Sequence, residues 1–145
     1  MSESGVSKDT FSRLKFEYPS LNSVKKFRTS STHGAMILNI PGVASHQDQK
    51  VVTYRLIIDA REFPSHKPQA FVFTPSDSEI KHCNVYHARP YSIWPNRLLC
   101  AVCDGVSSEM WNSYEGDELY LFGLWLNQLS QVLNNPNPDD SAREV

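Results

Sequence analysis

Four stretches rich in β-branched and aromatic residues follow one another in the first half of the chain, and they limit the possible fold more than any other feature. Breaks that contain Gly, Pro, Ser and His separate them, as is typical of an antiparallel meander. The four expected strands lie at residues 24–29, 35–40, 51–59 and 70–74. The sequence therefore predicts a four-stranded antiparallel sheet.

Amphipathic helices are expected on both sides of this sheet. Phe11, Leu14 and Tyr18 recur at helical spacing until Pro19 stops the pattern. A longer apolar face precedes the turn sequence at residues 134–138, and it consists of Leu119, Phe122, Trp125, Leu126, Leu129, Val132 and Leu133. A helix, a sheet, a long loop and a second helix predict an α+β fold in which the helices pack on one face or at the ends of the sheet.

The chain is long enough for one ordinary hydrophobic core and too short for two. Within its 145 residues we expect a single domain at residues 7–138, between polar, flexible tails at residues 1–6 and 139–145. The net charge of −2 gives no electrostatic sign of a nucleic-acid or anionic-membrane partner. Short apolar runs and the lack of a secretory signal predict a cytoplasmic protein with three free thiols.

Residues 75–117 hold several prolines and little periodicity, and long irregular segments of this kind often carry function. All three cysteines lie here, in the motifs His82-Cys83-Asn84 and Leu99-Cys100-Ala101-Val102-Cys103-Asp104. The plainest interpretation is that they are small buried apolar residues. Two chemical interpretations compete with it.

A zinc site is the first of these, because thiolates and imidazoles at short spacing bind zinc. Its ligands would be His82, Cys83, Cys100 and Cys103. The side chains of adjacent residues diverge in an extended segment, which weakens this set. No βαβ pattern surrounds the Cys-x-x-Cys motif, which disfavours a redox pair. We therefore expect neither a metal nor an organic cofactor.

Covalent catalysis through a thiolate is the second chemical interpretation. It requires a partly exposed cysteine and a donor for the oxyanion that forms when a carbonyl is attacked. Asn84 is a suitable donor, and a side-chain amide in that position typically contributes a factor of ~10²–10³ in rate. An asparagine in a loop is otherwise most often a turn residue.

Two motifs near the middle of the chain resemble ubiquitin-conjugating (E2) enzymes. Residues 63–74 are similar to the family's aromatic-Pro-x-x-x-Pro segment and the strand that follows it. Residues 82–86, His-Cys-Asn-Val-Tyr, resemble the family's His-Pro-Asn box, with Cys83 in place of its proline.

Further motifs follow in the family's order. Leu99-Cys100 resembles the apolar-Cys active-site step, Trp111 matches the family tryptophan, and residues 126–140 are similar to the helix that ends in Pro-Asn-Pro-Asp. The resemblance covers roughly residues 63–140. It implies a ubiquitin-conjugating (UBC-like) fold, with an N-terminal helix, a four-stranded meander, an active-site loop and a C-terminal helix.

The resemblance also implies roles for individual residues. Asn84 would stabilise the oxyanion during aminolysis of a thioester, and His82 would be structural. Cys100 is our preferred nucleophile because an apolar residue precedes it, whereas Cys103 is the alternative because it lies eight residues before Trp111, the usual family spacing. Asp104 would position the incoming amine or face water.

Residues 87–96 look inserted relative to the family, so that Cys100 lies sixteen residues after Asn84. Together with the missing proline, this insertion resembles the divergent bacterial E2-like proteins of antiphage systems, notably the stand-alone type in short type II CBASS operons. That resemblance implies a partner, a cyclic-dinucleotide synthase (CD-NTase) whose C-terminal glycine is joined to the cysteine. A ubiquitin-like protein from another bacterial conjugation operon is the alternative donor. Because the chain has no Gly-rich phosphate loop, a separate activating enzyme or a pre-activated donor is expected.

Two rival interpretations assign no catalysis to the chain. One is an inactive E2 variant that only binds other proteins, and the other is a zinc-stabilised adaptor. Tyr91, Trp94 and Trp111 would form a docking surface in such a module, although aromatic residues in a domain of this size are more often part of the core.

Overall fold

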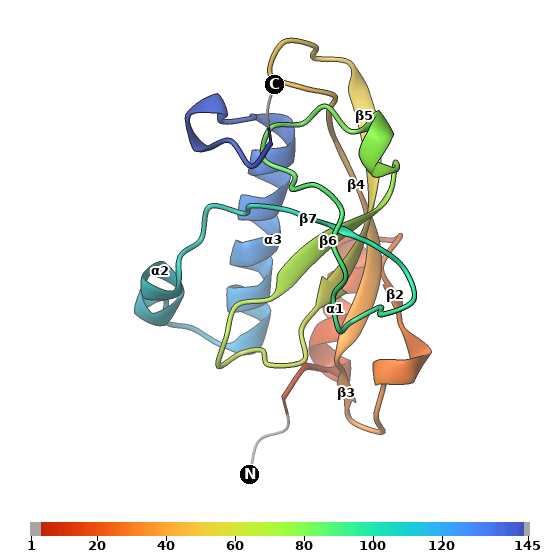
Figure 1. Cartoon of the computed structure of the whole chain (residues 1–145). Coiled ribbons are helices and arrows are strands. Elements are labelled where there is room, and N and C mark those ends of the chain that lie inside the picture. Colours follow the sequence, from red (N-terminus) through yellow and green to blue (C-terminus); the bar gives the residue numbers. More distant parts are fainter. Residues whose placement is uncertain (1–3, 144–145) are drawn as a thin grey trace.

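Five antiparallel strands in one sheet form the frame of this protein (Figure 1). The computed structural model describes residues 4–143. Neighbouring strands follow one another along the chain, so the sheet is a meander. Its strands are β2 (Asn22–Ser23), β4 (Ala35–Val43), β5 (Val51–Asp59), β6 (Gln69–Thr74) and β7 (Cys100–Ala101). Two further strands, β1 (Val6–Ser7) and β3 (Thr32–His33), pair with each other in a small second sheet.

Helices precede and follow the sheet. They are α1 (Lys8–Glu17), α2 (Ser108–Ser113) and α3 (Glu118–Asn134), with 3₁₀ turns at η1 (Lys25–Phe27), η2 (Asp77–Glu79) and η3 (Pro138–Asp140). The Ser7 hydroxyl caps α1 by accepting the Thr10 N–H, and the Asp117 carboxylate accepts the Tyr120 N–H at the start of α3. Both expected helices are present, and the predicted α+β class with an antiparallel sheet is confirmed.

The details of the expected sheet need two corrections. Strands are present at 35–40, 51–59 and 70–74, but the strand expected at 24–29 is wrong, because the turn η1 interrupts it. In its place the two-residue β2, just before that stretch, pairs with β4 on the side opposite β5. The sheet instead gains β7, which comes from the segment that the sequence predicts to be irregular.

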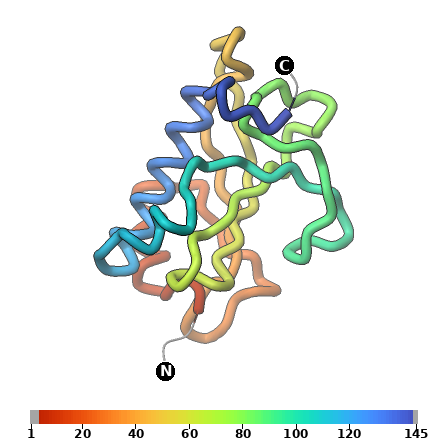
Figure 2. The backbone as a smooth tube through the Cα atoms, turned by 60° about the vertical axis from the view of Figure 1, so that its left-hand side comes forward, coloured from red at the N-terminus to blue at the C-terminus, as the bar shows by residue number. Residues whose placement is uncertain are grey.

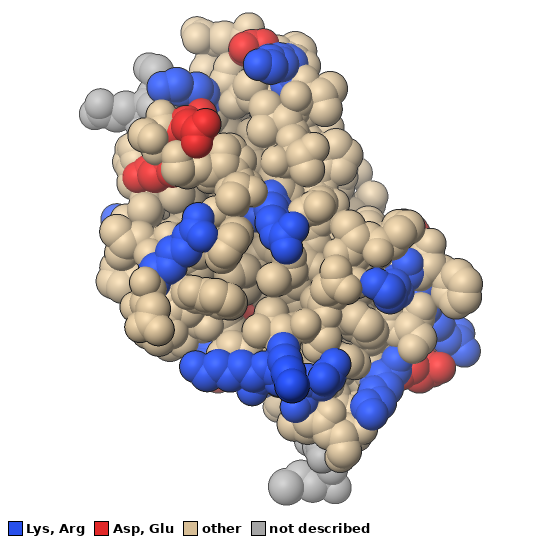
Figure 3. Space-filling view, turned by 90° about the vertical axis from the view of Figure 1, so that its right-hand side faces the viewer, with Lys and Arg blue, Asp and Glu red and all other residues tan. Residues whose placement is uncertain are grey.

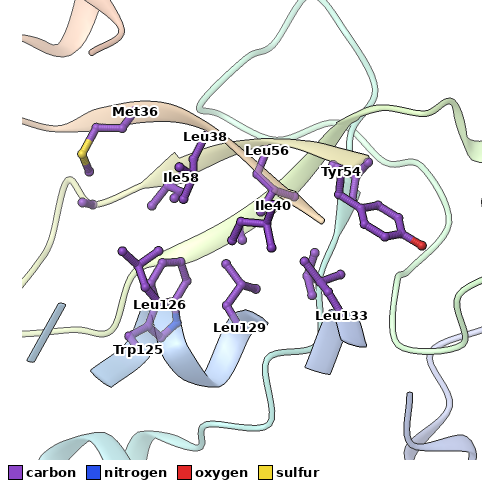
Figure 4. Packing of buried hydrophobic residues seen from close by; sticks show 14 of the residues in the cluster. Met36, Leu38, Ile40, Tyr54, Leu56, Ile58, Trp125, Leu126, Leu129 and Leu133 are labelled. Carbon is purple, nitrogen blue, oxygen red and sulfur yellow. The ribbon is translucent and has the colours of Figure 1, made fainter. Parts of the chain in front are cut away.

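The main core lies between one face of the sheet and α3. Alternate residues of β4 and β5 point toward the helix, because successive side chains of a strand face opposite ways. The register places Leu38 opposite Leu56 and Ile40 opposite Tyr54. Figure 4 shows these side chains above the apolar face of α3, where Trp125, Leu126, Leu129 and Leu133 are labelled.

A second, smaller apolar cluster covers the opposite face of the sheet, which we call the outer face. The residues that look inserted in the sequence fold back over this face. Tyr91 packs on Phe71 with ring centroids 4.5 Å apart, and Trp94 packs on Phe73 at 5.8 Å. Trp111 packs in the main core, only 5% exposed. All three aromatic residues that were considered for a docking surface therefore contact the body of the fold.

The ordered chain extends beyond residues 7–138 on both sides, into segments expected to be flexible tails. Val6 is fully buried and pairs with His33, and the N–H of Gly5 donates to the carbonyl of Phe63. At the other end, Ala142 donates to the Cys83 carbonyl, and Arg143 is 8% exposed. The expected tails at 4–6 and 139–143 are thus part of the fold.

Lys and Arg gather on the side of the sheet that faces away from α3 (Figure 3). Acidic side chains are sparse in the middle of this face and lie mostly toward its margins. Charge is therefore unevenly distributed, although the net charge is only −2. Within the described residues, no helix is long and apolar enough to cross a membrane.

Substituting Gly42 tests the contact between β4 and α3. A Cβ atom at Gly42 would lie 2.7 Å from the Leu133 carbonyl oxygen and 3.0 Å from the Leu133 Cβ, so the helix and strand must separate. We expect Gly42→Ala to lower the free energy of unfolding by about 1–3 kcal/mol in urea denaturation. Gly123→Ala is the matched control, because a Cβ there meets nothing within 4 Å and should stabilise α3 by roughly 0.5–1 kcal/mol. Equal effects of the two substitutions would contradict this packing.

Candidate functional site

Asn84 and Cys103 lie side by side, although they are nineteen positions apart in the sequence. Residues 84–86 run along the edge of β7 and its continuation. The Cys103 N–H donates to the Asn84 carbonyl at 2.8 Å, Val85 forms a bridge with Val102, and the Tyr86 N–H donates to the Ala101 carbonyl at 2.8 Å. Backbone pairing thus brings together the expected oxyanion donor and one of the two candidate nucleophiles.

Cys103 is the one partly exposed cysteine within the described residues. Its thiol donates to Asp140 Oδ2 at 3.7 Å. Burial raises the pKa of the thiol, and the charges of Asp140 and Asp104 raise it further, whereas a hydrogen bond from the Gly105 N–H opposes them. The same thiol is the main cause of a raised pKa at Tyr86, whose side chain is 40% exposed. The thiol is therefore partly accessible, and its raised pKa keeps it protonated at neutral pH beside the Asp140 carboxylate.

The Asn84 amide is buried and fully hydrogen-bonded. Its Nδ2 donates to the carbonyls of Asn137 at 3.1 Å and Asp140 at 3.0 Å. Its Oδ1 accepts the Asn137 N–H at 2.7 Å and the Cys83 thiol at 3.5 Å. The amide belongs to a residue whose backbone pairs with Cys103, and in this arrangement the segment after α3 occupies both of its donor hydrogens.

Cys100 occupies a different environment. It pairs with Val72 in the sheet, and its side chain joins the main core, where it is 3% exposed. Burial raises the pKa of its thiol. A thiol that takes an acyl group from another protein must be reached by that protein, so this placement reverses our order of preference between Cys100 and Cys103.

His82 connects the site loop to the end of α3. Its Nδ1 accepts the Asn84 N–H at 3.2 Å, which leaves the proton on Nε2 for the carbonyls of Val132 and Leu133 at 3.1 and 3.3 Å. Burial lowers the pKa of this fully buried imidazole, so it stays neutral. None of its hydrogen bonds reaches the Cys103 thiol. The side chain instead fixes the position of Asn84.

Asp104 neither faces water nor reaches the surface where an amine would approach, contrary to both roles expected for it. It is 4% exposed. Lys67 Nζ donates to both carboxylate oxygens at 2.9 and 2.8 Å, Trp125 Nε1 donates at 3.0 Å, and the Val106 N–H donates at 2.9 Å. This carboxylate holds the segment after Cys103 against α3.

The residues considered for zinc do not form a metal centre. Within residues 4–143, no group of three or more His, Cys, Asp or Glu side chains is arranged to hold a metal ion. Both ring nitrogens of His82 are already used by backbone groups. The four residues considered for zinc therefore do not come together as a ligand set in the part of the chain that the structure describes.

A polar cavity of about 680 Å³ lies near the candidate site but does not include it. Lys67, which pairs with Asp104, contributes to its wall, as do Arg61 and Trp111. Neither Asn84 nor Cys103 lines this cavity. The candidate site is thus separate from this cavity and lies beside residues 137–140.

Three residues that sequence reasoning did not place in the site belong to it: Tyr86, Asp140 and Arg143. Tyr86 follows Asn84 by two positions in the His-Cys-Asn-Val-Tyr motif, and Asp140 ends the Pro-Asn-Pro-Asp-Asp stretch. These two motifs could have indicated that Tyr86 and Asp140 belong to the site. Arg143 is not part of any motif, and the polar residues around it in the sequence favour a flexible tail instead.

Comparisons of the chain with protein-family models, with curated proteins and with solved structures found no match.

Proposed function

We propose that this chain is an E2-like conjugating enzyme with a ubiquitin-conjugating fold, in which Cys103 carries the C-terminal acyl group of a protein as a thioester. The observation that supports this most strongly is that three groups are held together by Asp140 and the neighbouring backbone. The partly exposed Cys103 thiol lies 3.7 Å from the Asp140 carboxylate, and the buried Asn84 amide donates to the Asp140 carbonyl. Nucleophile, proton acceptor and oxyanion donor are the groups that acyl transfer requires.

The chemistry has two steps. The Cys103 thiol gives its proton to Asp140 and attacks an activated carboxyl group, an acyl phosphate anhydride or a thioester, which forms the C–S bond and expels the leaving group. An amine then attacks the thioester, the C–N bond forms and the C–S bond breaks, and the proton that the amine loses passes to the departing thiolate. Asn84 stabilises the oxyanion in the second step once its donor hydrogens are released from residues 137–140. The thiolate is a good leaving group near neutral pH, which suits such a relay.

The donor that we propose is the C-terminus of a CD-NTase in bacterial antiphage defence, on the resemblance given above. A ubiquitin-like protein with its own activating enzyme is the alternative donor. The site is consistent with either, because Cys103 is partly exposed and a flexible protein C-terminus can reach it. Activation of the carboxyl group is assigned to another protein.

One observation favours a second candidate function, a binding module without catalysis. Main-chain carbonyls accept both donor hydrogens of the Asn84 amide, which is typical of a residue that stabilises a loop. In that case Cys103 would carry no acyl group.

Intact mass spectrometry separates the two functions. The protein is expressed together with its operon neighbours as wild type, Cys100→Ser and Cys103→Ser. We expect a wild-type adduct that thiols remove, the same adduct in Cys100→Ser, and in Cys103→Ser an ester that thiols do not remove. Absence of any adduct from all three proteins, with the neighbours folded, would support the binding module.

A further inference from the structure

The segment that follows α3 crosses directly over the candidate site. We call residues 137–143 the strap, and Figure 2 shows it turning from the end of α3 toward the segment around residue 80. The strap is held along its length. Asn84 contacts the backbone of Asn137 and Asp140, and the Ala142 N–H donates to the Cys83 carbonyl at 2.6 Å.

Arg143 anchors the end of the strap. Its guanidinium donates to four main-chain carbonyls: from Nε to Val85 at 2.5 Å, from Nη1 to Ile80 at 3.0 Å and to Asp77 at 3.4 Å, and from Nη2 to Tyr86 at 2.8 Å. It also pairs with Asp77, at 2.9 Å. Only 4% of the side chain is exposed. A buried charge is stable only where its N–H donors have acceptors and an opposite charge lies nearby. The planar guanidinium of Arg143 has both, in the main-chain carbonyls and in Asp77.

Asp77 connects this anchor to the segment that covers the outer face of the sheet. Besides Arg143, its carboxylate accepts from His87 Nδ1 at 3.0 Å and from the Ala88 N–H at 3.0 Å. His87 and Ala88 belong to the stretch that looks inserted in the sequence. The strap and the inserted stretch therefore share one carboxylate.

We propose that Arg143 is a positioning residue for the candidate site, because it fastens the strap that places the Asp140 carboxylate beside the Cys103 thiol and keeps the Asn84 amide occupied. Lifting the strap frees both donor hydrogens of Asn84. A catalytic role for the freed Asn84 amide rests on the proposed acyl transfer. The anchoring of the strap by Arg143 does not.

The anchor also lies near a second thiol. The charge of Arg143 lowers the pKa of the buried Cys100 thiol, which burial and the charge of Asp77 raise. With Arg143 truncated, four carbonyls and one carboxylate lose a donor, and the strap loses these contacts. The rate of alkylation at Cys100 thus measures opening of the strap, independently of any change in the reactivity of Cys103.

Alkylation with iodoacetamide tests this proposal without any donor protein. The rate at each cysteine is followed by peptide mass spectrometry from pH 6 to pH 10 in wild type, Arg143→Ala, Arg143→Lys and Asp140→Asn. The ionisable groups that face the Cys103 thiol are Asp140, Asp104 and Tyr86. Because Asp140 raises the pKa of the thiol, releasing it should move the midpoint of the rate profile to lower pH and increase the thiolate fraction at neutral pH.

We expect Arg143→Ala to be alkylated at Cys103 roughly three- to tenfold faster at pH 7.5, and to become reactive at Cys100 as well. Arg143→Lys should lie between it and wild type, because an ammonium cannot reproduce the planar contacts. Asp140→Asn should shift the Cys103 profile without exposing Cys100. Circular dichroism checks that each variant is folded.

Unchanged rates and an unchanged midpoint in folded Arg143→Ala would overturn the proposal. If that variant does not fold, Asp77→Asn decides, since it removes the ion pair and keeps the four carbonyl contacts. Faster alkylation of Cys103 in Asp77→Asn supports the anchor, and a wild-type rate rejects it. If the alkylation rates change as expected but Cys103 does not accept an acyl group, the result contradicts the proposed function and leaves the anchoring role of Arg143 supported.

Discussion

Replacing Asn84 with alanine should slow aminolysis of a thioester on Cys103 by a factor of ~10²–10³, because the oxyanion loses its side-chain donor. The measurement is single-turnover discharge of the preformed thioester to free lysine, normalised to the amount of thioester at the start. Normalisation separates the transfer step from any effect on loading.

Two controls separate the amide from its surroundings. Cys83→Ala alters a fully buried side chain that contacts Asn84 Oδ1 and keeps the amide, so transfer should stay within a few-fold of wild type. Arg143→Ala loosens the strap and also keeps the amide, so it should not reproduce the loss. If Asn84→Ala discharges at the wild-type rate, Asn84 is only a loop residue.

Truncating Asp104 to alanine should have the largest effect on stability, a loss of about 3–5 kcal/mol in the free energy of unfolding. The buried carboxylate accepts from Lys67, from the Trp125 indole and from the Val106 N–H, and alanine leaves these donors without a partner. Urea denaturation followed by tryptophan fluorescence measures the loss.

Asp104→Asn is the matched variant, because an amide oxygen still accepts from the indole and the backbone while the charge is lost. It should cost clearly less than alanine. A loss below about 1 kcal/mol in Asp104→Ala would contradict the view that this residue holds the segment after Cys103. Acyl loading per folded molecule should persist in both variants, since the hydrogen bonds of Asp104 stabilise the fold and none of them reaches the Cys103 thiol.

The helices and the three longer strands were predictable because each buries one face over many residues. The stripe that runs from Leu119 to Leu133 has the period of a helix, and β4 and β5 are rich in β-branched and aromatic residues between turn-forming breaks. Residues 24–29 also have strand-like composition, but Phe27 reaches the outer face from a 3₁₀ turn instead. β7 has two residues, too few to leave any period in the sequence.

The candidate site was predictable in its residue types but not in its arrangement. The motifs identified Asn84 and the two cysteines, yet the choice between the cysteines depends on the side of the sheet to which each belongs. Cys100 points into the core because it pairs with Val72, and Cys103 reaches the surface where the chain leaves the sheet. No local pattern around either cysteine encodes this pairing.

The strap was missed for a different physical reason. Polar residues near a chain end usually indicate a solvated tail, because they bury little apolar area. Arg143 is buried through hydrogen bonds to carbonyls and an ion pair, which leave no hydrophobic signal in the sequence. The gathering of Lys and Arg on one face (Figure 3) was equally unpredictable, because the net charge does not say where on the surface the charged residues lie.

Peptide sequencing of the trapped adduct tests the central claim most directly. The Cys103→Ser protein, expressed with its operon neighbours, is digested and the linked peptides are fragmented in a mass spectrometer. We predict that the side-chain oxygen of residue 103 is joined to the C-terminal carboxyl group of a partner protein, and that the Cys100 peptide is unmodified. A link at any other residue of this chain, or through an internal residue of the partner, would contradict the account.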